Sequence, residues 1–283
     1  MDLEKKAIER IKLASEMSMQ YYGKPLVCTY SGGKDSDVML ELFKRSGAQF
    51  EAVNSHTTVD APQTVYHIRK KFKELEEKGI KCTIHKPKLT MWQLIEKKKM
   101  PPCRMQRYCC EYLKENTTPN RFVATGVRWD ESQKRSKRGI MEVPGAKIKD
   151  RITLMNDNDD KRLLIERCEI KGSMISNPII DWRHHDIWDF IRSEKIEYNS
   201  LYDDGYKRVG CIGCPMAGKS RYKEFRDFPT YKRAYIRAFD KMLIAINEAG
   251  KKTRWKSGND VFLWWMEDEN IEGQMNIEDY LNQ

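Results

Sequence analysis

The segment that most constrains the fold reads KPLVCTYSGGKDSDVMLELFKRSG and runs from Lys24 to Gly47. It begins with a short apolar, β-rich run behind Pro25, and Gly32 and Gly33 follow that run directly. Beyond the glycines, apolar residues recur with the period of a helix, and Gly47 stands where a helix C-cap is expected. The segment therefore predicts a strand, a tight loop and a helix in immediate succession.

Strand-like and helix-like runs continue to alternate after this segment. Further strands are predicted over 49–55, 81–87 and 121–128, a fifth element over 176–181, and helices over 61–79 and 183–194. Alternation of this kind is typical of a parallel sheet with helices packed against it. We therefore expect an α/β fold with a doubly wound, mainly parallel sheet flanked by helices.

The ends of the chain and one charged stretch add to this framework. Residues 1–17 show the pattern of an amphipathic helix, and 231–250 and 259–270 show helical patterns near the C-terminus. Residues 131–173 are rich in Lys, Arg, Asp and Asn and are predicted to form an insertion, either a hairpin joining 150–154 to 162–170 or a flap. We expect a nucleotide-binding domain over 1–228 and a C-terminal helical extension over 229–283.

Charge and hydropathy narrow the classes of partner. The 283 residues carry a net charge of +10 with a pI near 9.1, which favours an anionic partner such as a nucleotide, a nucleic acid or both. No apolar run approaches the roughly 20 residues that a membrane helix needs. The N-terminal segment does not have the pattern of a secretory signal, so a cytoplasmic location is expected. Eight cysteines in such a protein favour metal or redox chemistry over disulfides.

The loop between the first strand and the first following helix has the properties of an anion site. Parallel α/β sheets bind ligands beyond the carboxyl ends of their strands, where helix N-termini present free N–H groups. Gly32 and Gly33 allow the backbone to approach an oxyanion closely, Ser31 and Ser36 supply hydroxyl groups, and Lys34 supplies a positive charge. The spacing is not that of a Walker loop.

These residues carry a resemblance to a known superfamily. The sequence from Ser31 to Ser36, SGGKDS, is similar to the SGGxDS signature of PP-loop adenine-nucleotide enzymes, the N-type ATP pyrophosphatases. The resemblance implies an adenine nucleotide alpha hydrolase-like fold that binds ATP or a sulfonucleotide, with Lys34 and Asp35 among the catalytic residues. Asp35 is expected to cap the helix, to bind Mg²⁺, or to do both.

The cysteines fall into two clusters and a remainder. Cys103, Cys109 and Cys110 lie in PPCRMQRYCCEY, and Cys211 and Cys214 form a Cys-x-x-Cys pair. On spacing alone this set is compatible with zinc, with an iron–sulfur cluster or with a redox pair. The remaining three lie in apolar strand-like runs and are expected to be inert buried thiols; they are Cys28, Cys82 and Cys168.

A Cys-Cys pair followed after about a hundred residues by Cys-x-x-Cys resembles the [4Fe-4S] signature of the sulfonucleotide reductases in the same superfamily. The resemblance implies that Cys109, Cys110, Cys211 and Cys214 are the cluster ligands. A structural zinc site is the main alternative, and Cys103 is an alternative ligand. Overall, the chain from about residue 24 to 216 is identified as similar to the phosphoadenosine phosphosulfate reductase family.

Two further segments extend the resemblance. TGVRWDESQKR resembles a Gly-x-Arg-x-x-x-Ser-x-x-Arg segment of the family, which implies that Gly126, Arg128 and Arg135 contact the nucleotide and that Arg128 acts in catalysis. An ordinary solvated basic loop is the alternative for the two arginines. Thr57, with its neighbour Thr58 after the second strand, is expected to line the adenine pocket.

The resemblance leaves more than one activity open. Sulfonucleotide reductases use a cysteine near their C-terminus, whereas no cysteine follows Cys214 in these 283 residues. We therefore expect an ATP pyrophosphatase that adenylates an acceptor for sulfur transfer, similar to the DNA phosphorothioation enzymes, with a nucleic acid as possible acceptor and a sulfur-donor or reductant protein as partner. The alternatives are a sulfonucleotide reductase with an external thiol, and a non-catalytic nucleic-acid-binding subunit with structural zinc.

Overall fold

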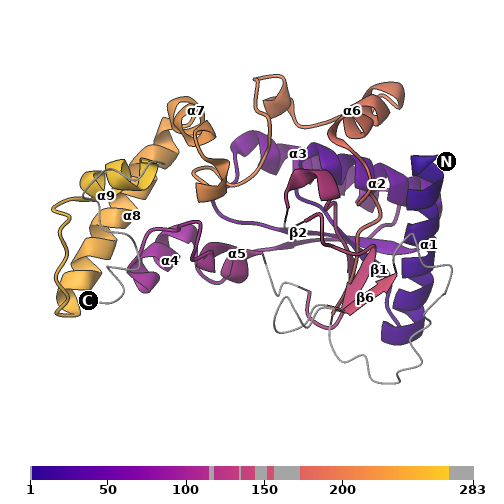
Figure 1. The fold of residues 1–283 in the computed structure, drawn as a ribbon, viewed down its shortest axis with the longest axis horizontal. Coiled ribbons are helices and arrows are strands. Elements are labelled where there is room, and N and C mark those ends of the chain that lie inside the picture. Colours follow the sequence, from indigo (N-terminus) through magenta and orange to yellow (C-terminus); the bar gives the residue numbers. More distant parts are fainter. Residues whose placement is uncertain (1, 115–117, 134, 144–151, 156–172, 268–283) are drawn as a thin grey trace. The chain divides into compact units, whose positions relative to one another are not determined.

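The computed structural model describes residues 2–114, 118–133, 135–143, 152–155 and 173–267 (Figure 1). These residues form two compact units. Unit 1 comprises 1–56, 60–87 and 112–210, and unit 2 comprises 57–59, 88–111 and 211–283. The predicted boundary after residue 228 lies inside unit 2, because 88–111 and 211–228 pack with the C-terminal helices.

Unit 1 contains one sheet, in which seven described strands have the order β3-β2-β1-β4-β7-β5-β6. The strands are β1 (Leu26–Thr29), β2 (Phe50–Ser55), β3 (Cys82–His85), β4 (Phe122–Ala124), β5 (Met141–Val143), β6 (Ile152–Met155) and β7 (Met174–Ser176). The pairs from β3 to β7 are parallel, whereas β5 is antiparallel to both β7 and β6. The predicted α/β fold with a mainly parallel sheet is confirmed.

Helices flank this sheet in unit 1. They are α1 (Leu3–Tyr22), α2 (Lys34–Ser46), α3 (Pro62–Glu76) and α6 (His184–Ser193), with short 3-10 turns η1 (Trp129–Glu131) and η3 (Ser200–Tyr202). The segment from Lys24 to Gly47 folds as predicted, with β1, a loop and α2 in succession. Gly47 ends α2 with a φ of 67°, the left-handed conformation that glycine adopts without strain.

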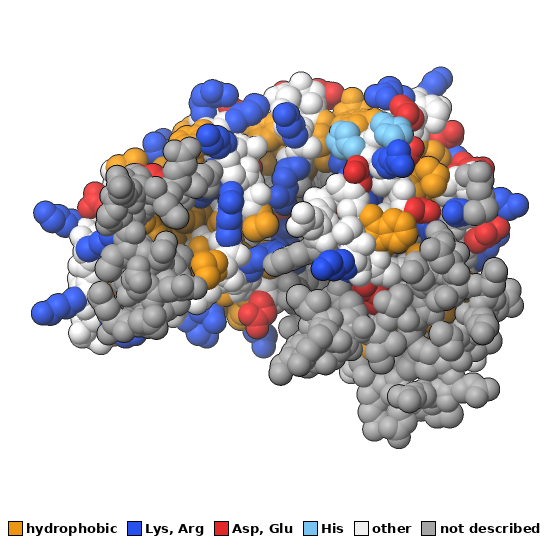
Figure 2. Space-filling view, in the orientation of Figure 1, with side chains coloured by type: hydrophobic (Ala, Val, Ile, Leu, Met, Phe, Trp, Pro, Cys, Tyr) orange, Lys and Arg blue, Asp and Glu red, His pale blue; other side chains and the backbone are white. Residues whose placement is uncertain are grey.

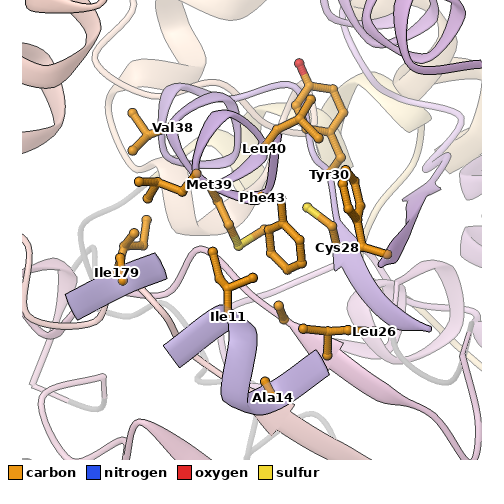
Figure 3. Packing of buried hydrophobic residues seen from close by; sticks show 14 of the residues in the cluster. Ile11, Ala14, Leu26, Cys28, Tyr30, Val38, Met39, Leu40, Phe43 and Ile179 are labelled. Carbon is orange, nitrogen blue, oxygen red and sulfur yellow. The ribbon is translucent and has the colours of Figure 1, made fainter. Parts of the chain in front are cut away.

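The main core lies on the face of the sheet to which alternate residues of β1 point. Leu26 and Cys28 are fully buried there against Ile11 of α1 and Phe43 of α2, as Figure 3 shows. Val27 points to the opposite face and joins a smaller apolar cluster. Since successive strand residues alternate between faces, the short run LVC buries all three side chains and fixes β1 at the centre of the sheet.

The strand order explains where a ligand site can form. The chain runs outward from β1 through β2 to β3, and then returns to place β4 on the other side of β1. A change of direction of this kind leaves a crevice beyond the carboxyl ends of the two diverging strands, here β1 and β4. The fold thereby brings the loop after β1 next to the segment 125–128 that follows β4.

Unit 2 is helical in its described part. It contains α4 (Met91–Lys98), the first residues of α5 (Tyr108–Leu113), the turn η4 (Pro215–Ala217), α7 (Ser220–Asp227), α8 (Pro229–Glu248) and α9 (Gly258–Met266). Its centre is aromatic: Tyr235 packs edge-on against Trp92 and Phe225, and Trp265 lies 4.8 Å from Tyr235 between ring centroids. Within the described residues, no helix is both long and apolar enough to cross a bilayer.

The charged insertion is only partly described. Residues 152–155 form β6 as the sequence indicates, and their antiparallel partner among the described residues is β5. The predicted partner segment 162–170 lies outside the described residues. Strand β5 was not predicted, because three residues inside a charged stretch carry too little apolar periodicity to be recognised.

Candidate nucleotide loop and cysteine site

The loop after β1 is shaped by its two glycines. Gly32 has a φ of 73°, and a Cβ atom there would lie 2.8 Å from Cγ1 of Ile68, so only glycine fits. Gly33 is the N-cap of α2, and a Cβ atom there would lie 3.4 Å from the Tyr202 hydroxyl. A steric cause for glycine is therefore clear at position 32, whereas at position 33 the backbone is extended and the contact would be an ordinary one.

Ser36 closes the loop on itself. Its hydroxyl accepts a hydrogen bond from the Gly33 N–H at 3.1 Å and donates one to the Gly33 carbonyl at 2.7 Å, while Ser31 lies 3.3 Å from it between hydroxyl oxygens. Among the described residues, the backbone N–H groups of Gly32 and Asp35 have no hydrogen-bond partner. These two N–H groups at the start of α2 are available to an anion.

Two buried cations converge on one carboxylate at the same place. Lys34 Nζ lies 2.7 Å from Asp35 Oδ2, and Arg128 Nε lies 2.7 Å from Asp35 Oδ1. Only 5% of Lys34 and 3% of Arg128 are exposed, so both charges are held in a region of low dielectric. Arg128 is also fixed by the Trp182 carbonyl, 3.4 Å from Nη1. The three residues predicted to be catalytic are therefore brought together.

Both oxygens of Asp35 are engaged by these cations, and its side chain does not cap α2. The predicted cap is wrong. A Mg²⁺ ion at Asp35 would have to displace Lys34 or Arg128, so the residues as arranged do not fit that ion well. Mg²⁺ binding stays a prediction, and no step below depends on it.

The loop is supported by residues that were not predicted. Asn199 is fully buried and donates from Nδ2 to the Gly32 carbonyl at 3.0 Å and to Thr64 Oγ1 at 3.1 Å. The Tyr202 hydroxyl accepts from the Lys34 N–H at 3.1 Å, and burial raises the pKa of this phenol. Both residues lie in the stretch YNSLYDDGY. Its polar side chains directly after a predicted helix were the only sign in the sequence that this stretch could contribute to a site.

A second unpredicted group lies under the first turn of α2. Asp37 is 3% exposed, and its Oδ1 accepts from the Tyr30 hydroxyl at 2.5 Å and lies 2.9 Å from His67 Nε2. Burial, with the Asp37 charge as a second cause, raises the pKa of Tyr30 well above its usual range. These contacts fasten α2 to β1 and α3 behind the loop.

The other predicted nucleotide contacts have different positions. Gly126 approaches the start of α2 closely, since a Cβ atom there would lie 3.4 Å from the Asp35 carbonyl oxygen. Arg135 is partly exposed and pairs with Glu131, which also accepts from the Arg128 N–H at 3.0 Å. Thr57 belongs to unit 2, where its Oγ1 lies 3.5 Å from Cys211 Sγ. The contact of Thr57 with adenine stays a prediction.

Unit 2 brings both cysteine clusters together. Cys109 and Cys110 lie at the start of α5, Cys211 and Cys214 lie in the turn before η4, and all four are partly buried. A hydrogen bond with Cys110 raises the pKa of the Cys109 thiol, and burial and the charges of Cys110, Cys211 and Cys214 raise it further. The four cysteines lie in the same compact unit, although Cys110 and Cys211 are 101 positions apart in the chain.

The turn that carries Cys211 and Cys214 is held by the helices of unit 2. Gly213 has a φ of 75°, and a Cβ atom there would lie 2.7 Å from Phe225 Cζ. Its N–H donates to Glu224 Oε2 at 2.7 Å, and the Tyr235 hydroxyl donates to the Ile212 carbonyl at 2.9 Å. Helices α7 and α8 therefore define the conformation of the turn.

The segment with Cys109 and Cys110 is fastened to the same helices. Trp265 Nε1 donates to the Pro102 carbonyl at 2.6 Å, and Arg104 Nε donates to the Pro215 carbonyl at 3.1 Å. Cys103 accepts from the Gln106 N–H at 3.2 Å between nitrogen and sulfur, which closes a turn ahead of α5. Side-chain hydrogen bonds thus hold the two cysteine segments in place within unit 2.

Polar groups surround the sulfur atoms. Arg107 donates to Cys110 Sγ at 3.3 Å, and the Thr57 hydroxyl lies 3.5 Å from Cys211 Sγ. An all-sulfur donor set with hydrogen bonds to the sulfurs fits an iron–sulfur cluster. Among the described residues, no three His, Cys, Asp or Glu side chains lie close enough to hold one metal ion. Both an iron–sulfur cluster and a zinc ion at these thiols stay predictions.

The remaining described cysteines differ from this group. Cys28 is fully buried in β1, and burial raises its pKa far above the ordinary thiol value. Burial also raises the pKa of Cys82 to about 12. Thiols in such surroundings carry little thiolate and have low reactivity. Cys168 lies outside the described residues.

The loop and the cysteine turn lie within one recognisable family domain. Residues 25–217 match the model of the phosphoadenosine phosphosulfate reductase domain. The chain belongs to this family. The match runs from the start of β1 to the end of η4, and so covers the SGGKDS loop, Arg128 and all four clustered cysteines.

The chain is similar to several curated relatives and to a solved structure. The chain is 27% identical over 253 residues to an uncharacterised protein of Methanocaldococcus jannaschii, a match of 88% of this chain that spans only about half, 54%, of that relative. It is 27% identical to the adenosine 5'-phosphosulfate reductase of Geobacillus kaustophilus, over 68% of this chain and 74% of the enzyme. The crystal structure of the Candida auris phosphoadenylyl-sulfate reductase in a phosphate complex is 19% identical and covers 74% of this chain and 93% of its own, with a TM-score of 0.45.

Proposed function

We propose that the chain binds ATP at the loop 31–36, cleaves it between the α and β phosphates, and uses the adenylate to activate an acceptor for sulfur transfer. The observation that carries this proposal is the convergence of Lys34 and Arg128 on Asp35 beside a helix N-terminus, at the β1/β4 crevice. Family membership supports adenine-nucleotide chemistry at this loop.

The charges at the loop suit a phosphoryl chain. Lys34 and Arg128 both contact Asp35, Arg128 Nη1 also lies 3.7 Å from Asp130 Oδ2, and the N–H groups of Gly32 and Asp35 add partial positive charge at the loop. An acceptor oxygen attacks the α-phosphorus, and pyrophosphate leaves with the electrons of the broken P–O bond. Fixed positive groups at such a site stabilise the negative charge that develops, which is electrostatic catalysis.

The four clustered cysteines would hold an iron–sulfur cluster. Cys109, Cys110, Cys211 and Cys214 would be its ligands, with Arg107 donating a hydrogen bond to one ligand sulfur. Such a cluster, when bound, supplies redox chemistry and iron that accepts sulfur ligands. The set of four thiols in one unit is the observation that supports this proposal.

The products formed from ATP test this proposal. We expect anaerobically purified protein to convert ATP labelled at the α-phosphate slowly to AMP and pyrophosphate, with water acting as a poor acceptor. A Gly33→Val variant should lose this turnover, because the side chain would occupy the space beside the Tyr202 hydroxyl. Formation of ADP and phosphate instead would contradict the proposal.

A sulfonucleotide reductase is the second candidate. It is favoured by relatives named adenosine 5'-phosphosulfate reductase that match about two thirds of the chain. This activity would need a thiol from another molecule or from one of the clustered cysteines. Release of sulfite from adenosine 5'-phosphosulfate in the presence of thioredoxin or dithiothreitol, without cleavage of ATP, would identify it.

A further inference from the structure

Positive charge is denser in unit 2 than in unit 1. The 100 residues of unit 2 contain 18 Lys and Arg and 13 Asp and Glu, and the 183 residues of unit 1 contain 34 and 29, so each unit has a net charge of +5. The smaller unit therefore has about twice the net positive charge per residue.

The excess is arranged along one side of α8. Arg233, Arg237 and Lys241 are spaced four residues apart, which places them on the same side of the helix, and all three are exposed. The opposite side of α8 is buried and carries Tyr235 and Phe239. Like charges at this spacing destabilise a helix. The stripe is therefore unfavourable for the isolated chain.

Carboxylates do not neutralise this stripe among the described residues. None of Arg233, Arg237 and Lys241 forms an ion pair there. The nearby Asp240 accepts a hydrogen bond from the Gly258 N–H at 2.6 Å instead. Unit 1 contains exposed cations that are paired, such as Lys70 with Glu197, and others that form no ion pair among the described residues, such as Lys12 and Lys73. The stripe on α8 is set apart by its arrangement, with three such cations at successive four-residue spacings on one helix.

The loop from α8 to α9 adds cations next to the stripe. Lys251, Lys252 and Lys256 are exposed and form no ion pair among the described residues. The bond from the Gly258 N–H to Asp240 places the end of this loop beside the middle of α8. Figure 2 shows Lys and Arg side chains standing out along this edge of the surface, with few Asp or Glu between them.

We propose that this surface, defined as Arg233, Arg237, Lys241, Lys251, Lys252 and Lys256, binds the phosphate backbone of a nucleic acid. A row of unpaired cations on a helix and an adjacent loop matches the regular negative charges of a sugar-phosphate chain. Calling the bound nucleic acid the acceptor rests on the proposed function, whereas binding itself does not.

The test compares two triple variants of the full chain with equal loss of charge. The first is R233Q/R237Q/K241Q. The control is K70Q/K81Q/R192Q, which removes three exposed cations that are paired with Glu197, Glu51 and Asp189 in unit 1. Binding of a labelled RNA hairpin and of a DNA duplex of the same sequence is measured by fluorescence anisotropy from ~50 to ~200 mM salt.

We expect the first variant to bind at least tenfold more weakly than the wild type and to lower the slope of log K against log salt by about 2 to 3, since each phosphate contact contributes roughly 0.7 to 0.9. The control should bind like the wild type. A preference between the two probes identifies the type of nucleic acid. Equal losses in both variants, or wild-type binding to phosphatidylserine vesicles as tight as to either probe, would overturn the assignment.

Two further results separate this inference from the proposed function. Calorimetric titration with ATP should give the same affinity in both triple variants, because neither changes the loop. If the wild type binds nucleic acid but not ATP, the proposed function is wrong and the assignment of the surface to nucleic-acid binding is retained. If it binds ATP but no nucleic acid at ~50 mM salt, the surface assignment fails; this is the result expected if the five carboxylates of residues 268–283 neutralise it.

Discussion

Arg128 Nε lies 2.7 Å from Asp35 Oδ1, although 93 residues separate the two in the chain. The contact forms because β1 and β4 are neighbours in the sheet and end at the same edge, so that α2 and the segment after β4 meet there. Lys34 occupies the other oxygen of the same carboxylate. The three side chains form a small cluster of charges to which a phosphoryl chain can bind.

The geometry of Arg128 should matter more than its charge. We expect Arg128→Lys to weaken ATP binding by tenfold or more, about 1.4 kcal/mol, because an ammonium group cannot hold Asp35 and the Trp182 carbonyl together. Arg192→Lys is the matched control, since Arg192 pairs with Asp189 on the surface. Calorimetric titration with ATP measures both. Equal affinities in the two variants would remove Arg128 from the site.

The two glycines at the ends of α2 should have separable effects. Gly33→Val should abolish ATP binding with little change in thermal stability, because φ at Gly33 is −100° and the added atoms lie beside Tyr202. Gly47→Ala should lower the free energy of unfolding by about 1 kcal/mol, because φ there is 67° in open space, and should leave ATP binding unchanged.

Thermal unfolding with and without ATP measures both variants of α2. The wild type and Gly47→Ala should each gain stability when ATP is added, because a ligand that binds the folded state raises its apparent stability. Gly33→Val should gain none. A gain in Gly33→Val equal to that of the wild type would exclude the loop as the binding site.

Asn199 should hold the loop 31–36 in its conformation. Asn199→Ala removes a buried donor from the Gly32 carbonyl and from Thr64, so we expect a loss of about 2 kcal/mol in the free energy of unfolding and weaker ATP binding. Urea unfolding followed by ATP titration checks this, with the exposed Asn247→Ala as control. If Asn199→Ala binds ATP as tightly as the control does, Asn199 has only a structural part.

These residues show how far the sequence alone could go. The strand, loop and helix from Lys24 to Gly47 were predicted because their signals are local: an apolar run, two glycines and a helical period. Asn199 and Tyr202 could not be recognised as supports of the loop, because their contacts depend on how η3 packs against α2 and α3. Thr57 lies beside Cys211, because the chain leaves unit 1 directly after β2, and this neighbour could not be recognised from the sequence.

The cysteine variants test the predicted iron–sulfur cluster, because a cysteine outside the clustered group serves as the control. Cys109→Ser and Cys214→Ser should lose most bound iron and acid-labile sulfide, because each removes one of four neighbouring thiolate ligands. Cys82→Ser should retain both, because Cys82 belongs to β3 of unit 1 and burial raises the pKa of its thiol to about 12. Iron and sulfide analysis of anaerobically purified protein measures the outcome.

The variant Cys103→Ser is measured in the same experiment. In the wild type the Cys103 sulfur accepts a hydrogen bond from the Gln106 N–H and closes a turn. We therefore expect Cys103→Ser to reduce cluster content less than Cys109→Ser does. The reverse order would make Cys103 a ligand in place of one member of the adjacent pair. Zinc without iron in the wild type would contradict the iron–sulfur assignment altogether.

The central claim is that ATP is the nucleotide bound at the loop 31–36, and parallel calorimetric titrations of the anaerobically purified protein with ATP and with adenosine 5'-phosphosulfate test it most directly. The account predicts that ATP binds at least tenfold more tightly, because Lys34, Arg128 and the loop N–H groups can contact more oxygens of a longer phosphoryl chain. Tighter binding of adenosine 5'-phosphosulfate would contradict the account and identify a sulfonucleotide site.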